Sequence, residues 1–165
     1  MDNKPFDEEL KAKYDKLGKQ YAIEIAKDIF GAKVVRENIK EDHADFSDGF
    51  WDLEFEKAGK KFKVEPEIKV GHWDEQYAEF LNRPFEYRTM DIPFRKNKNI
   101  ADYHMVIDDN GKYGFVVARS EMNKCKVITK RTIYEPNGGP YFSIPVSLGF
   151  FVEKVNGLWQ RWEPK

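Results

Sequence analysis

Apolar and polar side chains alternate along two neighbouring stretches of the chain, residues 50–57 and 61–70. Because a strand places every second side chain on the same face, each stretch predicts a strand with one apolar face. Ala58, Gly59 and Lys60 separate the stretches, and a short segment that contains glycine is typical of a hairpin turn. The pattern therefore predicts a β-hairpin over residues 50–70.

Apolar side chains recur at steps of three and four over residues 7–30, which predicts a helix. Asp7 and Glu8-Glu9 favour its start, and Gly31 favours its end. Glu24 lies within roughly 60° of the apolar stripe, where a carboxylate needs a partner because burying an unpaired charge is costly. A metal below the helix, a lysine or solvent could each supply that partner. The stripe consists of Leu10, Tyr14, Leu17, Tyr21 and Ile25.

The rest of the chain predicts further strands. Residues 71–84 predict a short helix or an irregular lid, and Asp108-Asp109-Asn110-Gly111 predicts a tight turn, since Asn-Gly tolerates the positive φ of a type I′ turn. We therefore expect one α/β or α+β domain with a central, mixed, twisted sheet flanked by helices. The remaining expected elements are strands at 33–36, 87–94, 100–107, 112–118, 127–134 and 141–152, a loop at 37–48 and a helical turn at 120–126.

The polar face of the predicted hairpin carries candidate chemistry. Glu67 and Lys69 share that face, and pairing of the two strands would bring Asp52 near both. Mg²⁺ prefers oxygen ligands, commonly one or two carboxylates with several waters. A metal held in this way polarises a phosphoryl oxygen and activates water, and a nearby lysine offsets developing charge. The alternative is an exposed strand face with alternating charges.

Asp52, followed about fifteen residues later by Glu67-Ile68-Lys69 in a strand, resembles the PD-(D/E)XK nuclease superfamily over roughly residues 17–118. The resemblance implies a restriction-endonuclease-like core over about 7–118, followed by a strand-rich extension over 119–165. It also implies that Asp52, Glu67 and the backbone carbonyl of Ile68 bind Mg²⁺, or Mn²⁺ in its place. Lys69 would assist the attacking water.

Members of the superfamily often carry a glutamate on the helix before the first core strand, and Glu24 occupies that position. The resemblance implies that it completes the outer shell or holds a second metal. The chain departs from the pattern because no proline precedes Asp52. Asp48 is therefore a rival for the aspartate role.

These features predict a metal-dependent nuclease that hydrolyses phosphodiester bonds, and the resemblance makes a DNA endonuclease the expected form, with RNA the less favoured substrate. A homodimer would suit cleavage of both strands. One alternative is a non-catalytic module that binds nucleic acid or protein on the same fold. Another is a Holliday-junction resolvase. The presence of all three residues, Asp52, Glu67 and Lys69, favours an enzyme.

A net charge of −1 argues against tight, non-specific binding of nucleic acid by the whole surface, because duplex-binding proteins are usually basic. A local basic group is still compatible with it. Arg95, Lys96 and Lys98 form the preferred candidate, since they directly follow a strand-like segment. The other basic clusters are Lys57 to Lys63 and Lys124 to Arg131, and each could equally be a solvated loop.

Cys125 is the single cysteine, so the chain can form neither an internal disulfide nor a cysteine zinc site. The charged N-terminus shows no signal peptide, and no apolar run reaches the length of a membrane span. We therefore expect a cytoplasmic protein without a membrane partner, and both a viral and a bacterial origin stay open.

Overall fold

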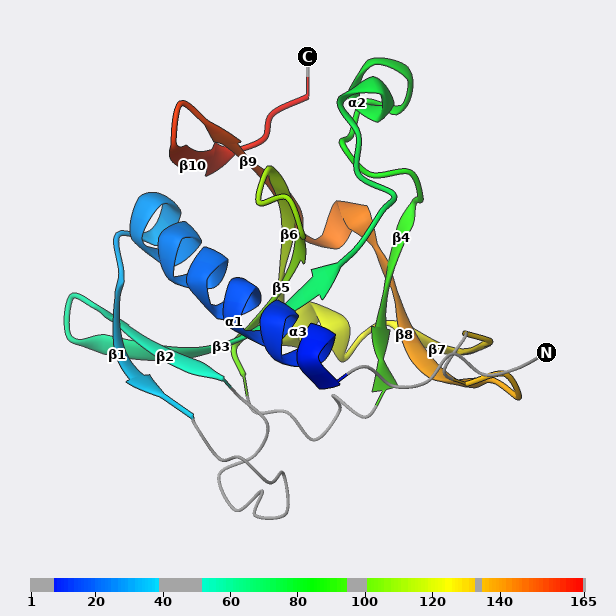
Figure 1. The fold of residues 1–165 in the computed structure, drawn as a ribbon, viewed down its shortest axis with the longest axis horizontal. Helices are drawn as coiled ribbons and strands as arrows, with labels where there is room; N and C mark the ends of the chain where they lie inside the picture. Colours follow the sequence, from blue (N-terminus) through cyan, green and yellow to red (C-terminus); the bar gives the residue numbers. More distant parts are fainter. Residues whose placement is uncertain (1–7, 39–51, 95–100, 133–134, 165) are drawn as a thin grey trace.

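The computed structural model describes residues 8–38, 52–94, 101–132 and 135–164 (Figure 1). Its helical elements are α1 (Glu8–Ile25), the π-helical turn η1 (Ala26–Phe30), α2 (Glu75–Leu81), α3 (Arg119–Met122) and the 3₁₀ turn η3 (Val146–Leu148). Its strands are β1 (Lys33–Glu37), β2 (Leu53–Lys57), β3 (Lys60–Lys69), β4 (Thr89–Pro93), β5 (Tyr103–Asp108), β6 (Tyr113–Ala118), β7 (Lys126–Lys130), β8 (Gly139–Pro145), β9 (Phe150–Val155) and β10 (Leu158–Arg161).

The described strands form two sheets. The large sheet has the order β1-β2-β3-β5-β6-β9-β10, and only its β3–β5 pair is parallel. The small sheet has the order β4-β8-β7 and is antiparallel. The fold is therefore mixed α+β, with a mixed central sheet as predicted. Within the described ranges, no helix has both the length and the apolar character needed to cross a lipid bilayer.

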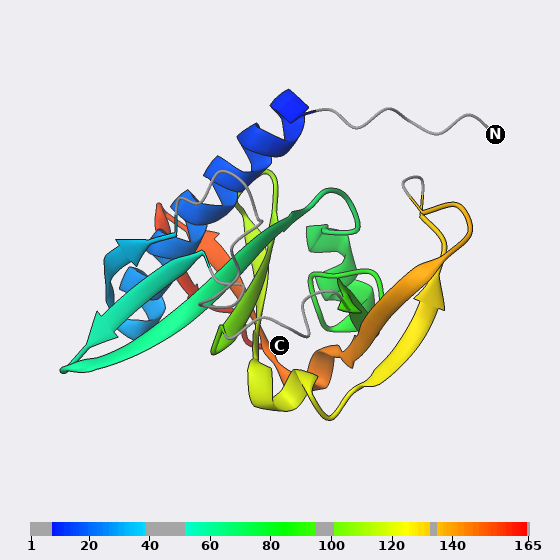
Figure 2. The ribbon, with the colours of Figure 1, turned by 90° about the horizontal axis from the view of Figure 1, so that it is seen from below.

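Helix α1 and η1 cover one face of the large sheet (Figures 1 and 2). Gly18, at the middle of α1, is buried against Pro66 and Ile68 of β3. This contact confirms that the even-numbered residues of β3 form its apolar face. The helix ends at Gly31, whose positive φ of 64° closes the turn.

The small sheet covers the opposite face (Figure 2). Helices were expected to flank the sheet, but in the described chain this holds for one face only, because the second face packs against strands. Apolar residues at alternate positions of β4 and β8 meet those of β5, β6 and β9. This second core includes Met90, Ile92, Phe142 and Ile144 from the small sheet and Val106, Phe115, Val117 and Phe151 from the large one.

The predicted hairpin forms as β2 and β3. Ala58 and Gly59 form its turn with positive φ values of 51° and 79°, as a type I′ turn requires. The second predicted type I′ turn differs, because only Gly111 has a positive φ there. Its N–H donates to the carbonyl of Asp108.

The expectation of one strand over 141–152 was wrong. The chain leaves the small sheet at Pro145, turns through η3 and enters the large sheet at Phe150. Apolar and aromatic residues continue on both sides of Pro145 and Gly149, which conceals this change of sheet. The last strand, β10, was not predicted, and it places Trp159 in the core beside α1.

Candidate active site

The backbone of Asp52 is held between two strands. Its N–H donates to the carbonyl of Val64 (3.2 Å), and its carbonyl accepts a hydrogen bond from the N–H of Asn38 (2.9 Å). Leu53 and Val64 form the end register pair of β2 and β3, and the same Val64 carbonyl also receives the Asp52 N–H. The structure thus places the backbone of Asp52 beside Val64, three residues before Glu67 on β3.

Lys69 follows Glu67 on the face of β3 that points away from α1. Ile68 lies between them in sequence, with its side chain on the α1 face near Gly18. In the described chain β2 ends opposite Val64, so the last residues of β3 pair with β5 alone. The backbone of Ile68 therefore lies next to an edge of the sheet at which a ligand could reach a carbonyl.

Lys69 is anchored through its backbone and lies in a charged environment. The indole Nε1 of Trp73 donates to the carbonyl of Lys69 at 3.0 Å. Burial lowers the pKa of the Lys69 ammonium, and the positive charge of Lys130 lowers it further. The carboxylates of Glu67 and Asp91 act in the opposite direction. A lysine with a lowered pKa exchanges a proton more readily near neutral pH, as catalytic lysines do.

Asp91 and Lys130 were not predicted as site residues. Asp91 comes from β4 and Lys130 from β7, and their side chains form an ion pair with Nζ and Oδ2 3.0 Å apart. The carboxylate of Asp91 is 15% exposed and its Oδ1 atom is buried. The available signal was a charged residue between the apolar Met90 and Ile92, but only the packing of the two sheets brings it beside Lys69.

Glu65 and His104 are buried polar residues close to Asp52. Glu65 is 5% exposed and His104 is 2% exposed, and they are register partners on the parallel strands β3 and β5. Glu65 adds a buried acid on the same face of β3 as Glu67, and a buried carboxylate must be stabilised by its surroundings.

The donor set suits a hard cation that retains water. No group of three or more His, Cys, Asp or Glu side chains in the described ranges comes close enough to form a complete metal cage. Mg²⁺ does not need one, because it usually binds one or two carboxylates and keeps several waters. Asp52, Glu67 and the carbonyl of Ile68 therefore fit Mg²⁺ or Mn²⁺, which share a preference for oxygen.

Glu24 is not brought to this face. Its Oε1 atom accepts a hydrogen bond from Nζ of Lys154 on β9 at 2.7 Å, on the α1 side of the sheet. Strand β9 lies three positions from β3 in the sheet order, about 14 Å away at the usual strand spacing. The physical reason is that the rotation of α1 directs Glu24 toward β9 instead of toward β3.

Several predicted residues lie outside the described ranges. These include the rival Asp48 and the basic group Arg95, Lys96 and Lys98, so their placement stays a prediction. His72 contacts Glu86, with Nδ1 and Oε2 2.8 Å apart.

No protein-family model, curated protein or solved structure matches this chain. Function must therefore be inferred from the positions and chemistry of the residues themselves. The motif resemblance remains a prediction that experiments must test.

Proposed function

We propose that the protein is a metal-dependent nuclease that hydrolyses phosphodiester bonds in DNA, on a restriction-endonuclease-like core. The observation that carries the proposal is the position of Asp52 beside β3, whose last residues carry Glu67 and Lys69 on one face. The element order also supports it. A helix precedes three antiparallel strands, and a crossover leads to β5, parallel to β3. This order agrees with the resemblance to PD-(D/E)XK nucleases.

Asp52 and Glu67 would hold Mg²⁺ together with the carbonyl of Ile68. When bound, such an ion polarises the phosphoryl oxygen and lowers the pKa of a coordinated water. The two carboxylates supply the negative charge that attracts the cation. Their attachment to neighbouring paired strands keeps the donors in place before the substrate arrives, which lowers the cost of reorganisation.

Lys69 would act on the attacking water. Its ammonium group cannot be a metal ligand, but it can orient a water molecule, and as a neutral amine it can accept a proton. Lys130 adds positive charge beside it, which favours the neutral amine and attracts a phosphate oxygen. Asp91 fixes Lys130 by the 3.0 Å ion pair, so the small sheet contributes to the same reaction centre.

Cleavage of supercoiled plasmid DNA tests the proposal. Wild-type protein should nick or linearise the plasmid with Mg²⁺ or Mn²⁺ and lose activity in excess chelator. Asp52→Asn should be inactive, whereas Glu54→Gln, two residues further along and paired with Arg36, should remain active. Undiminished cleavage by Asp52→Asn, or in excess chelator, would overturn the proposal. DNA binding without cleavage at every metal tested would instead favour a non-catalytic binding module.

A further inference from the structure

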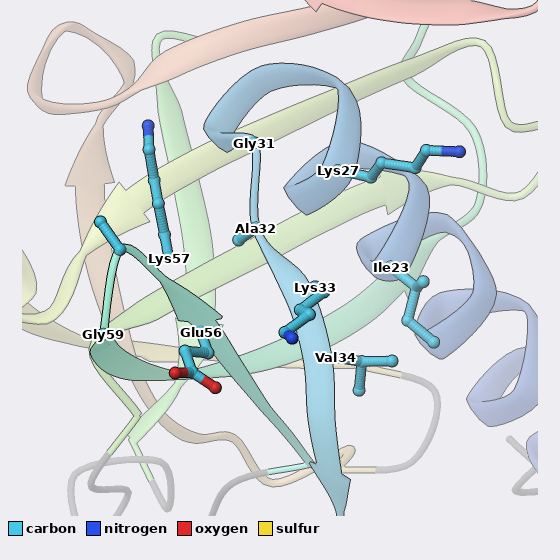
Figure 3. Close-up of a pocket in the computed structure, with 10 residues that line it drawn as sticks. Ile23, Lys27, Gly31, Ala32, Lys33, Val34, Glu56, Lys57 and Gly59 are labelled. Carbon is cyan, nitrogen blue, oxygen red and sulfur yellow. The ribbon is translucent and has the colours of Figure 1, made fainter.

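A basic hollow lies at the opposite end of β3 from Lys69. Its volume is about 710 Å³, and it opens between the end of η1, the start of β1 and the β2–β3 turn. Figure 3 shows Lys27, Lys33 and Lys57 around it, each from a different element, with Glu56 at its side. A second hollow of about 340 Å³ adjoins Lys57 and adds Lys60 and Lys61. Lys57 therefore links the two hollows into one surface, here called the lysine surface.

The five lysines of this surface are exposed, and none forms an ion pair with another described residue. By contrast, Lys154 pairs with Glu24 and Lys130 pairs with Asp91. Glu56 is the one carboxylate among the residues that line the two hollows. Because the chain as a whole has a net charge of −1, this concentration of positive charge is a local feature. Such a patch attracts anions and raises their local concentration.

The arrangement of the lysines indicates the form of the anion. In Figure 3 the ammonium groups of Lys27 and Lys57 point to different sides of the opening, and Lys33 lies between them. They do not converge on one point, as the capture of a single phosphate would require. A row of separated ammonium groups instead suits an extended polyanion with regularly spaced charges, such as a nucleic-acid backbone, which carries one charge per roughly 3.4 Å on each strand.

The lysine surface is separate from the candidate active site. β3 has ten residues and spans about 30 Å from the lysine surface to Lys69. Lys57 lies on the α1 side of the large sheet, next to Gly31, whereas Lys69 faces away from α1. The tip of the β2–β3 hairpin forms an extremity of the molecule, where a long ligand meets no obstruction from the described elements (Figure 2).

We propose that the lysine surface binds the phosphate backbone of duplex DNA at a position separate from the candidate active site. This inference rests on the proposed nuclease function for its substrate, but it concerns residues that take no part in the chemistry. It also explains how a nearly neutral protein could hold a polyanion.

The test is fluorescence anisotropy with a labelled duplex of about 24 base pairs, roughly two helical turns, in excess chelator so that no cleavage occurs. The triple variant Lys27→Gln, Lys57→Gln, Lys61→Gln should bind at least tenfold more weakly at moderate salt. The slope of log K against log salt should become shallower by about 2 to 3, near 0.9 for each phosphate that is no longer neutralised.

The matched control is Lys11→Gln, Lys13→Gln, Lys16→Gln, which removes the same charge from exposed positions on α1. It should bind the duplex like wild type. An equal loss in the control, or an unchanged slope in the test variant, would overturn the inference. Competition by polyglutamate as effective as that by DNA would also overturn it, because the surface would then be a general polyanion site.

Failure of the inference is distinguishable from failure of the nuclease assignment. If Asp52→Asn still cleaves DNA, the assignment of the active site is wrong, but the binding result remains valid. If Asp52 is essential but the triple variant binds normally, the lysine surface alone is refuted.

Discussion

The Nζ atom of Lys130 on β7 lies 3.0 Å from Oδ2 of Asp91 on β4, and this ion pair of the small sheet borders Lys69 at the end of β3. The small sheet is therefore more than a cover for the second core. It places the Asp91–Lys130 ion pair beside Lys69, the residue expected to act on water. That position makes the protonation of Lys69 sensitive to a strand far away in sequence.

Replacing Lys130 should change the pH dependence of cleavage. The charge of Lys130 lowers the pKa of Lys69, so Lys130→Met should raise that pKa toward the ordinary lysine value. If the rate requires the neutral amine, the rise of kcat with pH should move to higher pH. Rate–pH profiles of wild type, Lys130→Met and the control Lys126→Met on the same strand would reveal the shift. Identical profiles would mean that Lys69 does not titrate in the reaction.

Metal binding should separate Glu67 from Lys69. Glu67→Ala removes a ligand and should reduce Mn²⁺ affinity at least tenfold, together with cleavage. Lys69→Ala should abolish most cleavage yet leave Mn²⁺ affinity within a few-fold of wild type, because an ammonium group has no lone pair for the metal. Calorimetric titration of Mn²⁺ into each variant measures this. Equal loss of metal binding in both would assign Lys69 a structural role.

Asp108 should make the protein less stable as the pH rises. Burial raises the pKa of this carboxyl to about 6, and Asp109 adds to the effect. Between the ordinary value of 3.8 and about 6, the folded protein retains a proton that the unfolded chain has released. This contribution is complete below the lower value and is lost as the pH rises through the higher one.

Asp108→Asn should therefore stabilise the protein at pH 8 by about 1–3 kcal/mol and have little effect at pH 3. The asparagine oxygen can still accept the hydrogen bond that Asp108 Oδ1 receives from the Asn110 N–H at 3.3 Å. Urea unfolding at both pH values gives the comparison. A gain of equal size at pH 3 and pH 8 would contradict the ionisation argument.

Gly18→Ala should stabilise the fold. A methyl group there would lie 3.6 Å from Cβ of Pro66 and 3.7 Å from Cγ1 of Ile68, which are ordinary contact distances. Alanine also favours the helix by about 0.8–1.0 kcal/mol over glycine. Thermal unfolding should show a higher Tm. Gly111→Ala is the contrasting variant and should be destabilised, because its methyl group would meet the ring of Tyr21 at 2.6 Å and its φ is 67°.

Glu24 should matter for stability more than for cleavage. Glu24→Gln removes the negative charge 2.7 Å from Nζ of Lys154 and should cost about 1 kcal/mol, because the pair is partly buried. The double variant with Lys154→Met should recover part of this loss in a double-mutant cycle. A loss of cleavage of more than tenfold at unchanged stability would support a catalytic role for Glu24.

The hairpin and the first helix were predictable because each exposes one face and buries the other. On β3 the apolar Val64 and Ile68 lie on one face and the charged Glu67 lies on the other. The alternation in the sequence therefore shows which face each residue occupies. The helix over α1 was predicted as well, but its buried residues are Gly18, Ala22 and Ile25, of which only Ile25 belongs to the predicted stripe.

The small sheet was not predictable in the same way. Phe142 and Phe151 both belong to the second core although they lie in different sheets, so local polarity gives no sign of the change between them. The meeting of Asp91, Lys130 and Lys69 depends on how two sheets pack, which no local pattern encodes. The partner of Glu24 stayed open for a related reason, since a helical stripe defines a face but not the strand beneath each residue.

The short link between β8 and β9 has a consequence for folding. Only residues 146–149 separate the two strands, and Gly149 has no room for a side chain because a Cβ there would clash with the backbone oxygen of Val116. The small sheet is thus tied directly to β9, the second strand from one edge of the large sheet. Because this short link joins the two sheets, disruption of one sheet should also disrupt the other. The chain should therefore unfold cooperatively in a single step. Catalytic competence would then vanish together with the native state, and no partly folded form would retain it.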